Sequence, residues 1–172
     1  MVRSSISFIA IALLLGCTSK QEIDLTEGYS KKVTYHKQLQ KTEKTQLYQD
    51  NVTKVLLTGT YLYTPNFENN DIRDEVFIVG LYMEDKVSVA LNSGGNTLTL
   101  NGKTAKEIKA LRLDDERLKE LSFVTPWSSY YLVTFAHESN KKITLSFESA
   151  AYGKGELHFA KVAKYVLTKE AL

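Results

Sequence analysis

The sequence predicts a mainly β protein: an antiparallel sandwich of two sheets with about eight short strands and one short helix. Apolar and polar residues alternate over several segments, which is typical of strands with one buried face. Turn residues separate these segments at short intervals, and such tight connections favour antiparallel neighbours. The pattern contains no regular alternation of strands and helices, so a parallel sheet is disfavoured. A closed barrel is the main alternative architecture.

The first strands and their turns are predicted from local patterns. The alternating segments are residues 55–63, 77–83 and 87–91. Two further strands, Thr97–Leu100 and Lys103–Ile108, flank Asn101-Gly102, a dipeptide that tolerates the positive φ angles of a type I′ hairpin turn. Ser93–Asn96 is a second turn signal. In residues 31–50 the choice stays open, because the segment begins like a strand but Gln38–Gln49 also fits a helix.

The second half contains one helical signal and three more strands. Leucines at positions 111, 113, 118 and 121 fit one helical face, with acidic residues 114–116 in the first turn, where they favour the helix dipole. The strands are expected at Tyr130–His137, Lys142–Ser149 and Glu156–Val162. Two hairpins are expected to join them, at Ser139-Asn140 and at Gly153–Gly155. Tyr130–Ala136 is apolar on both faces, which predicts a central or covered strand.

Four segments of this strand pattern resemble a group of small lipoproteins of Gram-negative bacteria. They are Gly59–Tyr63, Phe77–Tyr82, Leu98–Lys103 and Pro126–Val133. The resemblance covers roughly residues 50–165 and implies a variant immunoglobulin-like sandwich. It brings no functional residues with it. The Cys-Trp-Cys core of antibody domains is missing, since Trp127 has no disulfide to pack on.

The N-terminal segment resembles a bacterial lipobox. Arg3 precedes an apolar run, Ile6–Leu15, that is shorter than the about 20 residues of a membrane-spanning helix. The run ends in Leu14-Leu15-Gly16-Cys17, and Cys17 is the single cysteine of the chain. The resemblance implies a diacylglyceryl group on the Cys17 thiol, cleavage between Gly16 and Cys17, and acylation of the freed amine. The alternatives are an ordinary signal peptide beside an unmodified Cys17, or a structural cysteine of a cytoplasmic protein.

The lipobox defines the expected organisation of the chain. Residues 1–16 form the signal peptide, residues 17–29 the lipidated cysteine and a flexible tether, and residues 30–172 a single β-sandwich domain. Thr18 follows Cys17, and the absence of Asp at this position favours the outer membrane under the sorting rule of the lipoproteins that this segment resembles. The expected location is therefore the cell envelope, with the membrane as partner through the lipid.

Composition excludes several classes of function. Cleavage removes one charge, Arg3, so the mature chain has 21 Lys and Arg against 20 Asp and Glu. Near-neutrality without basic clusters argues against nucleic acid as a partner. With Cys17 lipidated, no cysteine remains for a disulfide or for redox chemistry. The domain must therefore fold by packing alone, and no cofactor is expected.

Catalytic motifs are not found in the sequence. His36, His137 and His158 lack the spacing of a metal site, and no GxSxG motif is present. Acidic residues such as Asp71 and Asp74 could meet others in space as a glycosidase pair, but the sequence does not select them. The protein is therefore expected not to be an enzyme.

Two candidate binding regions remain. The loop Pro65–Asp74 offers oxygen ligands of the kind that calcium uses, in Asn66, Glu68, Asn69, Asn70, Asp71 and Asp74, although a solvated loop explains them as well. The second candidate is a set of aromatic residues, for which core packing is the alternative: Tyr61, Tyr63, Phe67, Trp127, Tyr130 and Tyr131.

Two functions compete on these observations. The favoured one is a membrane-anchored, non-enzymatic envelope lipoprotein that displays an immunoglobulin-like domain to another envelope protein or a surface ligand. The alternative is a periplasmic domain that binds or hydrolyses a small ligand at a site assembled from distant residues. A concave pocket with converging polar groups would favour the second, and a flat aromatic patch the first.

Overall fold

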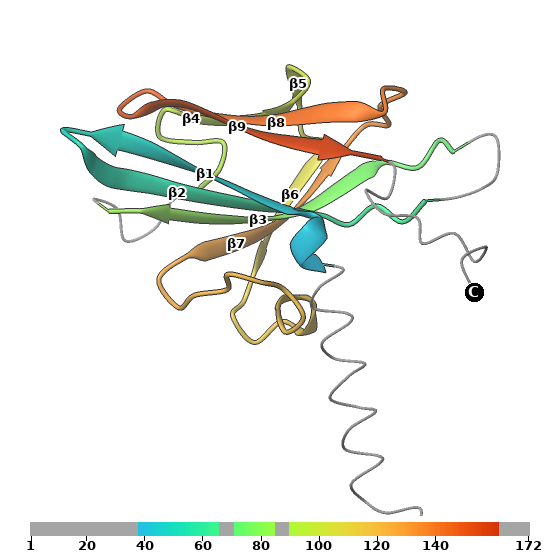
Figure 1. Cartoon of the computed structure of the whole chain (residues 1–172), viewed down its shortest axis with the longest axis horizontal. Coiled ribbons are helices and arrows are strands. Elements are labelled where there is room, and N and C mark those ends of the chain that lie inside the picture. The colour runs from blue at the N-terminus through green and yellow to red at the C-terminus, as the bar shows by residue number, and fades with distance from the viewer. Residues whose placement is uncertain (1–37, 66–70, 85–89, 162–172) are drawn as a thin grey trace, which may run out of the picture. The chain divides into compact units, whose positions relative to one another are not determined.

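The computed structural model describes residues 38–65, 71–84 and 90–161 of the chain. These residues form two antiparallel sheets, one with the strand order β1-β2-β3-β7-β6 and one with the order β5-β4-β8-β9 (Figure 1). The strands are β1 (Thr42–Gln49), β2 (Val52–Tyr61), β3 (Glu75–Met83), β4 (Asn96–Leu100), β5 (Lys103–Thr104), β6 (Glu107–Leu111), β7 (Ser129–Phe135), β8 (Lys142–Ser149) and β9 (Gly153–Ala160). The predicted mainly β, two-sheet sandwich is confirmed.

The connectivity is that of an immunoglobulin-like domain. The chain changes sheet between β3 and β4 and again between β7 and β8, while β3 pairs with β7 and β4 pairs with β8. With β2 to β9 named A, B, C, C′, D, E, F and G, the sheets read A-B-E-D and C′-C-F-G. Strand β1 pairs with β2, the strand named A, and adds a fifth strand at the edge of this sheet. The fold expected from the resemblance is therefore present, with an additional edge strand.

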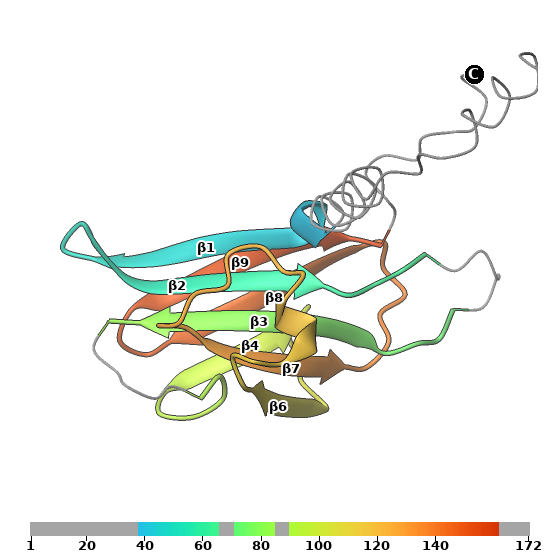
Figure 2. The ribbon, with the colours of Figure 1, turned by 90° about the horizontal axis from the view of Figure 1, so that it is seen from below.

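Figure 2 shows β4, β8 and β9 behind the five-stranded sheet, and the alternating residues of the strands form the core between the two sheets. In β2 the buried positions include Val55, Leu57 and Tyr61, and in β3 they include Phe77 and Val79, as the period of two predicts. The core continues into the second sheet through fully or nearly fully buried residues of β4, β8 and β9: Leu98, Leu100, Ile143, Leu145, Phe147, Leu157 and Phe159. Apolar burial on this scale is the main stabilising contribution.

Edge strand β1 shows that Thr42–Gln49, for which the sequence left strand and helix open, is a strand. Residues 38–40 form one helical turn, and Thr42–Gln49 then pairs with β2, so the helical interpretation of Gln38–Gln49 is wrong. Leu47 is buried and its neighbours are exposed, which suits a strand at the edge of a sheet. The hairpin turn at Asp50 and Asn51 has positive φ at both residues, 52° and 62°. Residues 31–37 lie outside the described ranges.

The hairpin at Asn101-Gly102 is confirmed, but the strand after it is shorter than expected. Both turn residues have positive φ, and Leu100 pairs with Lys103. The predicted strand Lys103–Ile108 is divided: β5 pairs with β4, and the chain then passes to the other sheet as β6. The Lys106 N–H donates to the Thr134 carbonyl of β7, which fixes this change of sheet.

The predicted helix over residues 111–121 is reduced to a single turn. A 3-10 helix spans Glu116–Leu118, and the Asp115 carboxylate caps it by accepting from the Arg117 N–H. Leu111 instead belongs to β6, where it pairs with Tyr130. Because the β ladder holds Leu111 in an extended conformation, the four leucines cannot share one helical face.

Two further predictions in the second half need correction. The segment after β7 is not a hairpin, because β7 and β8 lie in different sheets and the chain crosses between them. The β8–β9 hairpin is confirmed, but its turn lies at residues 150–152, and Gly153 already pairs with Ser149. Of the predicted strand 87–91, residues 87–89 lie outside the described ranges, and Leu91 is buried in a turn rather than in a strand.

Candidate functional site

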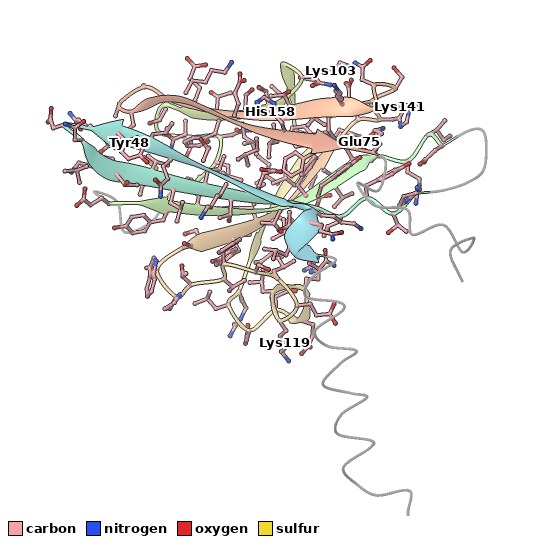
Figure 3. All side chains as sticks on the ribbon, in the orientation of Figure 1. Tyr48, Glu75, Lys103, Lys119, Lys141 and His158 are labelled. Carbon is pink, nitrogen blue, oxygen red and sulfur yellow. The ribbon has the colours of Figure 1, made fainter. Side chains whose placement is uncertain are left out.

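We define two ends of the sandwich by the direction of β1. The near end is where β1 begins, β2 ends, β3 begins, β7 ends and β9 ends, and the far end is the opposite one. A cluster of ionised side chains lies at the near end, around Glu75 (Figure 3). Glu75 is the first residue of β3 and is only 1% exposed. A buried carboxylate needs several partners, because an unpaired charge is costly away from water.

Both oxygens of Glu75 are used within the protein. One accepts a hydrogen bond from the Tyr61 hydroxyl, and the other accepts from the Glu138 N–H at 2.9 Å and from the Lys161 ammonium. The Nδ1 atom of His137 lies 3.5 Å from the second oxygen and 3.0 Å from the Arg73 carbonyl oxygen. The carboxylate therefore acts as a structural anion that joins β2, β3 and the residue after β9.

A second buried carboxylate extends the cluster toward the Asn101-Gly102 turn. Glu138 accepts hydrogen bonds from the Asn101 side-chain amide at 3.2 Å and from the Lys103 ammonium. Its backbone carbonyl also accepts from Lys161. The hydrogen bond from Lys103 lowers the pKa of the Glu138 carboxyl more than its burial raises it. The cluster thus neutralises its own charges and connects both sheets.

Tyr61 is unsuited to acid–base chemistry. Burial, followed by the hydrogen bond to Glu75, raises the pKa of its phenol far above the usual value. Its ring stacks on Phe77 with a centroid distance of 4.6 Å. The side chain is therefore a neutral hydrogen-bond donor that belongs to the core.

A shallow hollow of about 310 Å³ lies beside the cluster. Its lining consists of Tyr61, Leu62, Tyr63, Thr64, Arg73, Asp74 and Val76. The charged groups here bond to other residues: Asp74 to Lys106 at 2.6 Å, and Arg73 to both Asp71 and the Thr64 carbonyl. A ligand entering the hollow would have to replace these interactions.

The calcium hypothesis for Pro65–Asp74 gains nothing from the described part of the loop. Hydrogen bonds from the Arg73 side chain hold the pKa of the Asp71 carboxyl well below its usual range, and Asp74 pairs with Lys106. Asn66, Glu68, Asn69 and Asn70 lie outside the described ranges. Among the described residues, no three His, Cys, Asp or Glu side chains are grouped so that they could hold a metal ion.

The lowered pKa of Glu138 predicts how the stability of the domain changes at acidic pH. Because the pKa of Glu138 is lowered by folding, its ionised form stabilises the protein above the ordinary carboxyl range of about 4 to 4.5. That contribution is lost as the pH falls through the lowered pKa of the folded state. Replacing Glu138 with Gln is therefore expected to lower the urea midpoint at pH 7 but to have a shrinking effect below about pH 4.

The control is Glu148→Gln, which removes an exposed carboxylate from β8. Urea titrations at a series of pH values would compare both variants with the wild type. A Glu138→Gln effect that is the same at pH 7 and pH 3 would contradict the assignment of Glu138 as a stabilising ionised group.

The second candidate region is the connection between β6 and β7, residues 112–128, which we call the cap. It lies on the outer face of the five-stranded sheet, as Figure 1 shows below β7. Leu118 of the cap packs with Ile78 of β3 and Tyr130 of β7, and Leu121 and Val124 pack against the same group. The cap therefore buries the outward side of β7, which confirms that this strand is covered on both faces.

Tyr130 braces the part of the cap that precedes β7. Its hydroxyl accepts from the Thr125 N–H at 2.7 Å and donates to the Phe123 carbonyl at 3.3 Å. Its ring rests on the backbone of Gly80, where an added Cβ would come within 2.7 Å of the ring. The Tyr130 side chain therefore ties the cap to the middle of the sheet.

A turn directly after this brace presents Trp127. The Ser128 N–H donates to the Thr125 carbonyl at 3.4 Å, and the two side-chain hydroxyls are 2.9 Å apart. Trp127 lies in this turn with 66% of its surface exposed. Since Trp is large and apolar, this much exposure is unusual for a residue without a partner.

The six aromatic residues singled out in the sequence do not form one surface. Tyr61 and Tyr130 are buried, Tyr63 and Tyr131 are partly buried against the core, and Phe67 lies outside the described ranges. Trp127 is exposed. Cys17 and Gly16 also lie outside the described ranges. Of the five that the structure describes, Trp127 is the strongly exposed side chain.

Other exposed apolar side chains were not singled out in the sequence. They are Tyr48, Val52, Ile72, Leu113 and Phe123. Phe123 also has a positive φ of 66°, uncommon for a bulky residue, and the Lys44 ammonium lies 5.2 Å from its ring centroid. Leu113 and Phe123 belong to the cap. Their exposure follows from the irregular path of the cap, which does not form the helix that the leucine spacing predicts.

Comparisons with known proteins add no relative. No protein-family model matches the chain, and neither the curated proteins nor the solved structures give a match. None of the described helical segments is long and apolar enough to cross a membrane. The candidate sites are therefore judged on their own geometry.

The hydrogen bonds of the Tyr130 hydroxyl, which hold the turn before β7, predict a measurable property of Trp127, the single tryptophan of the chain. Its fluorescence is expected to show the emission wavelength of a solvent-exposed indole together with the high anisotropy of a fixed side chain. Tyr130→Phe keeps the ring but removes two hydrogen bonds, so anisotropy is expected to fall and stability to decrease by about 1 kcal/mol. Tyr82→Phe on β3 is the control. Unchanged anisotropy in Tyr130→Phe would contradict the role of the brace.

Proposed function

We propose that the protein is a non-enzymatic lipoprotein of the cell envelope, most consistent with the outer membrane, whose immunoglobulin-like domain binds another protein or a surface ligand. The lipobox that ends at Cys17 supports the anchor, and the exposed Trp127 supports the binding role. Acyl chains supply about 0.8 kcal/mol per buried CH₂, and two or three chains give stable attachment. The folded domain then needs no membrane-binding surface of its own.

The observation that carries the binding role is the contrast between Trp127 and the ionised cluster. The cluster satisfies its own charges, so it offers a substrate few free groups. Trp127 has the opposite character: a large apolar side chain is held in water on a hydrogen-bonded turn. Tryptophan is enriched at the centres of protein interfaces, where its burial contributes strongly to affinity.

The anchor is tested by replacing the lipidated residue. Cys17→Ala is expected to abolish incorporation of a labelled fatty acid and to leave the protein unprocessed or released from the membrane fraction. Ser19→Ala, two residues further on, is the control and is expected to incorporate the label normally. Labelling and membrane association that persist in Cys17→Ala would refute the lipoprotein assignment.

The hollow beside the cluster is the one observation that favours the alternative, a small-ligand-binding or hydrolytic domain. Its polar groups, Arg73 and Asp74, would recognise a charged or polar ligand once their present partners were displaced. A thermal-shift screen of small anions, amino acids and sugars tests this idea. Stabilisation that disappears in Arg73→Leu would support a ligand site, and the lack of any shift would speak against it.

A further inference from the structure

The strand directions gather four connections at the far end of the sandwich. They are the β1–β2 turn at residues 50–51, the turn at 91–95 before β4, the Trp127 turn at 125–128 before β7, and the β8–β9 turn at 150–152. Figures 1 and 2 show the β1–β2 hairpin and the beginning of β7 at this end. In the immunoglobulin-like numbering these include the B–C, D–E and F–G connections, so the fold groups separate loops into one surface.

Three of the six strongly exposed large apolar side chains in the described residues lie at the same end. Tyr48 is 57% exposed, Val52 is 48% exposed and Trp127 is 66% exposed. Tyr48 and Val52 flank the β1–β2 turn, and Trp127 precedes β7, which is two strands from β2. Since neighbouring strands are about 4.8 Å apart, β2 and β7 are separated by about 10 Å. One partner surface can therefore contact both positions.

The charged strand residues beside these side chains are mostly paired within the domain. Lys54 pairs with Glu84 at 2.5 Å, and Lys154 pairs with Glu156 at 2.7 Å. Exposed ion pairs of this kind are already satisfied, so they give little attraction to an oppositely charged partner. Apart from the exposed Asp50 in the β1–β2 turn, the described surface beside Tyr48 and Val52 fits an apolar partner, and aromatic anchors of this type are characteristic of protein interfaces.

The position of the anchor favours the same end. The described chain begins at Gln38 beside the near end, where the Thr42 hydroxyl donates to the Gln38 carbonyl. The 21 residue-to-residue steps from Cys17 to Gln38 span at most about 70 Å when extended. Attachment to the membrane through the near end leaves the far end as the part of the domain that can extend furthest from the membrane.

We infer that the far end, through Trp127, Tyr48 and Val52, is the recognition surface, and that its partner is an apolar patch on another envelope protein. This inference rests on the proposed function, a lipid-anchored binding domain, and names the surface and the class of partner. Affinity is expected to come from apolar burial, so it depends little on ionic strength.

Site-specific photo-crosslinking of the full-length protein in intact cells tests this inference. A photoreactive amino acid replaces Tyr48 or Val52 at the far end, and Ile72 or Lys141 at the near end. The expected result is one and the same crosslinked protein from both far-end positions and none from the near-end positions. The yield is expected to persist in 0.5 M salt and to fall at least tenfold when Trp127→Ala is combined with the probe at Tyr48.

Three results would overturn the inference: equal crosslinking from the two ends, crosslinking of the far end to phospholipid or to a second copy of the chain, or no far-end product. Ile72→Ala is the matched control for Trp127→Ala, since it removes an exposed apolar side chain from the near end. Fatty-acid labelling of Cys17 is measured in the same cells. Labelling without a far-end product contradicts this inference alone, and a far-end product without labelling contradicts the lipid anchor alone.

Discussion

Replacing Glu75 with leucine is expected to reduce the free energy of unfolding by about 3–5 kcal/mol, because it removes one partner of a buried ion pair. The Lys161 ammonium, the Tyr61 hydroxyl and the Glu138 N–H would all lose their acceptor. Leucine has a similar volume but offers no acceptor, so the Tyr61 hydroxyl and the Glu138 N–H would be left unsatisfied near the core, while Lys161 would keep its hydrogen bond to the Glu138 carbonyl. The effect would be seen as a lower midpoint in urea unfolding at pH 7.

Glu84→Leu is the matched control for this prediction. Glu84 follows β3 at its other end and pairs with Lys54, but its side chain is exposed, and such pairs are worth about 0–1 kcal/mol. The double variant Glu75→Leu with Lys161→Met removes both charges and is expected to recover part of the loss. A Glu75→Leu protein as stable as the Glu84→Leu control would show that the cluster is not important for stability.

Phe77→Ala is expected to destabilise the domain by about 3–5 kcal/mol, since it creates a cavity at the centre of the core. Phe77 is fully buried. Its ring stacks on Tyr61 at 4.6 Å and meets Phe135 and Phe159 edge-on at 6.0 and 5.2 Å. Phe159 belongs to the opposite sheet, so the truncation weakens the contact between the two layers.

The same substitution at Phe123 provides the control. Phe123 is 47% exposed in the cap, and its truncation is expected to cost less than about 1 kcal/mol. Both variants would be compared by urea unfolding followed by circular dichroism. If Phe77→Ala cost no more than Phe123→Ala, the assignment of Phe77 to the centre of the sandwich would be wrong.

Local patterns in the sequence were sufficient for most of the strands and for much of the core. The period of two in β2 and β3 identifies Val55, Leu57, Phe77 and Val79 as inward residues, and the structure buries them all. The same alternation includes Tyr61, so its burial also follows from the pattern. Asn101-Gly102 predicted its turn for a physical reason, the tolerance of positive φ.

Interactions between distant residues could not be predicted in this way. The pairing of Glu75 with Lys161 joins residues 86 positions apart, and nothing near either residue indicates the other. The short β5 and the change of sheet into β6 depend on the Lys106 N–H meeting Thr134, another long-range contact. The helix predicted over residues 111–121 was wrong because leucine spacing alone fits a helix. The positions of these leucines are instead determined by the pairing of Leu111 with Tyr130 in the sheet and by the packing of Leu118 against Ile78 and Tyr130.

The close contact between Gly80 and the Tyr130 ring links the interior of the sheet to the turn that carries Trp127. Any side chain at position 80 would push the ring outward, and the hydroxyl that holds Thr125 and Phe123 would move with it. The shape of the outer surface thus depends on a residue that no partner touches. For the binding role proposed above, substitutions in the middle of a buried strand are therefore expected to alter selectivity without any change among the exposed residues.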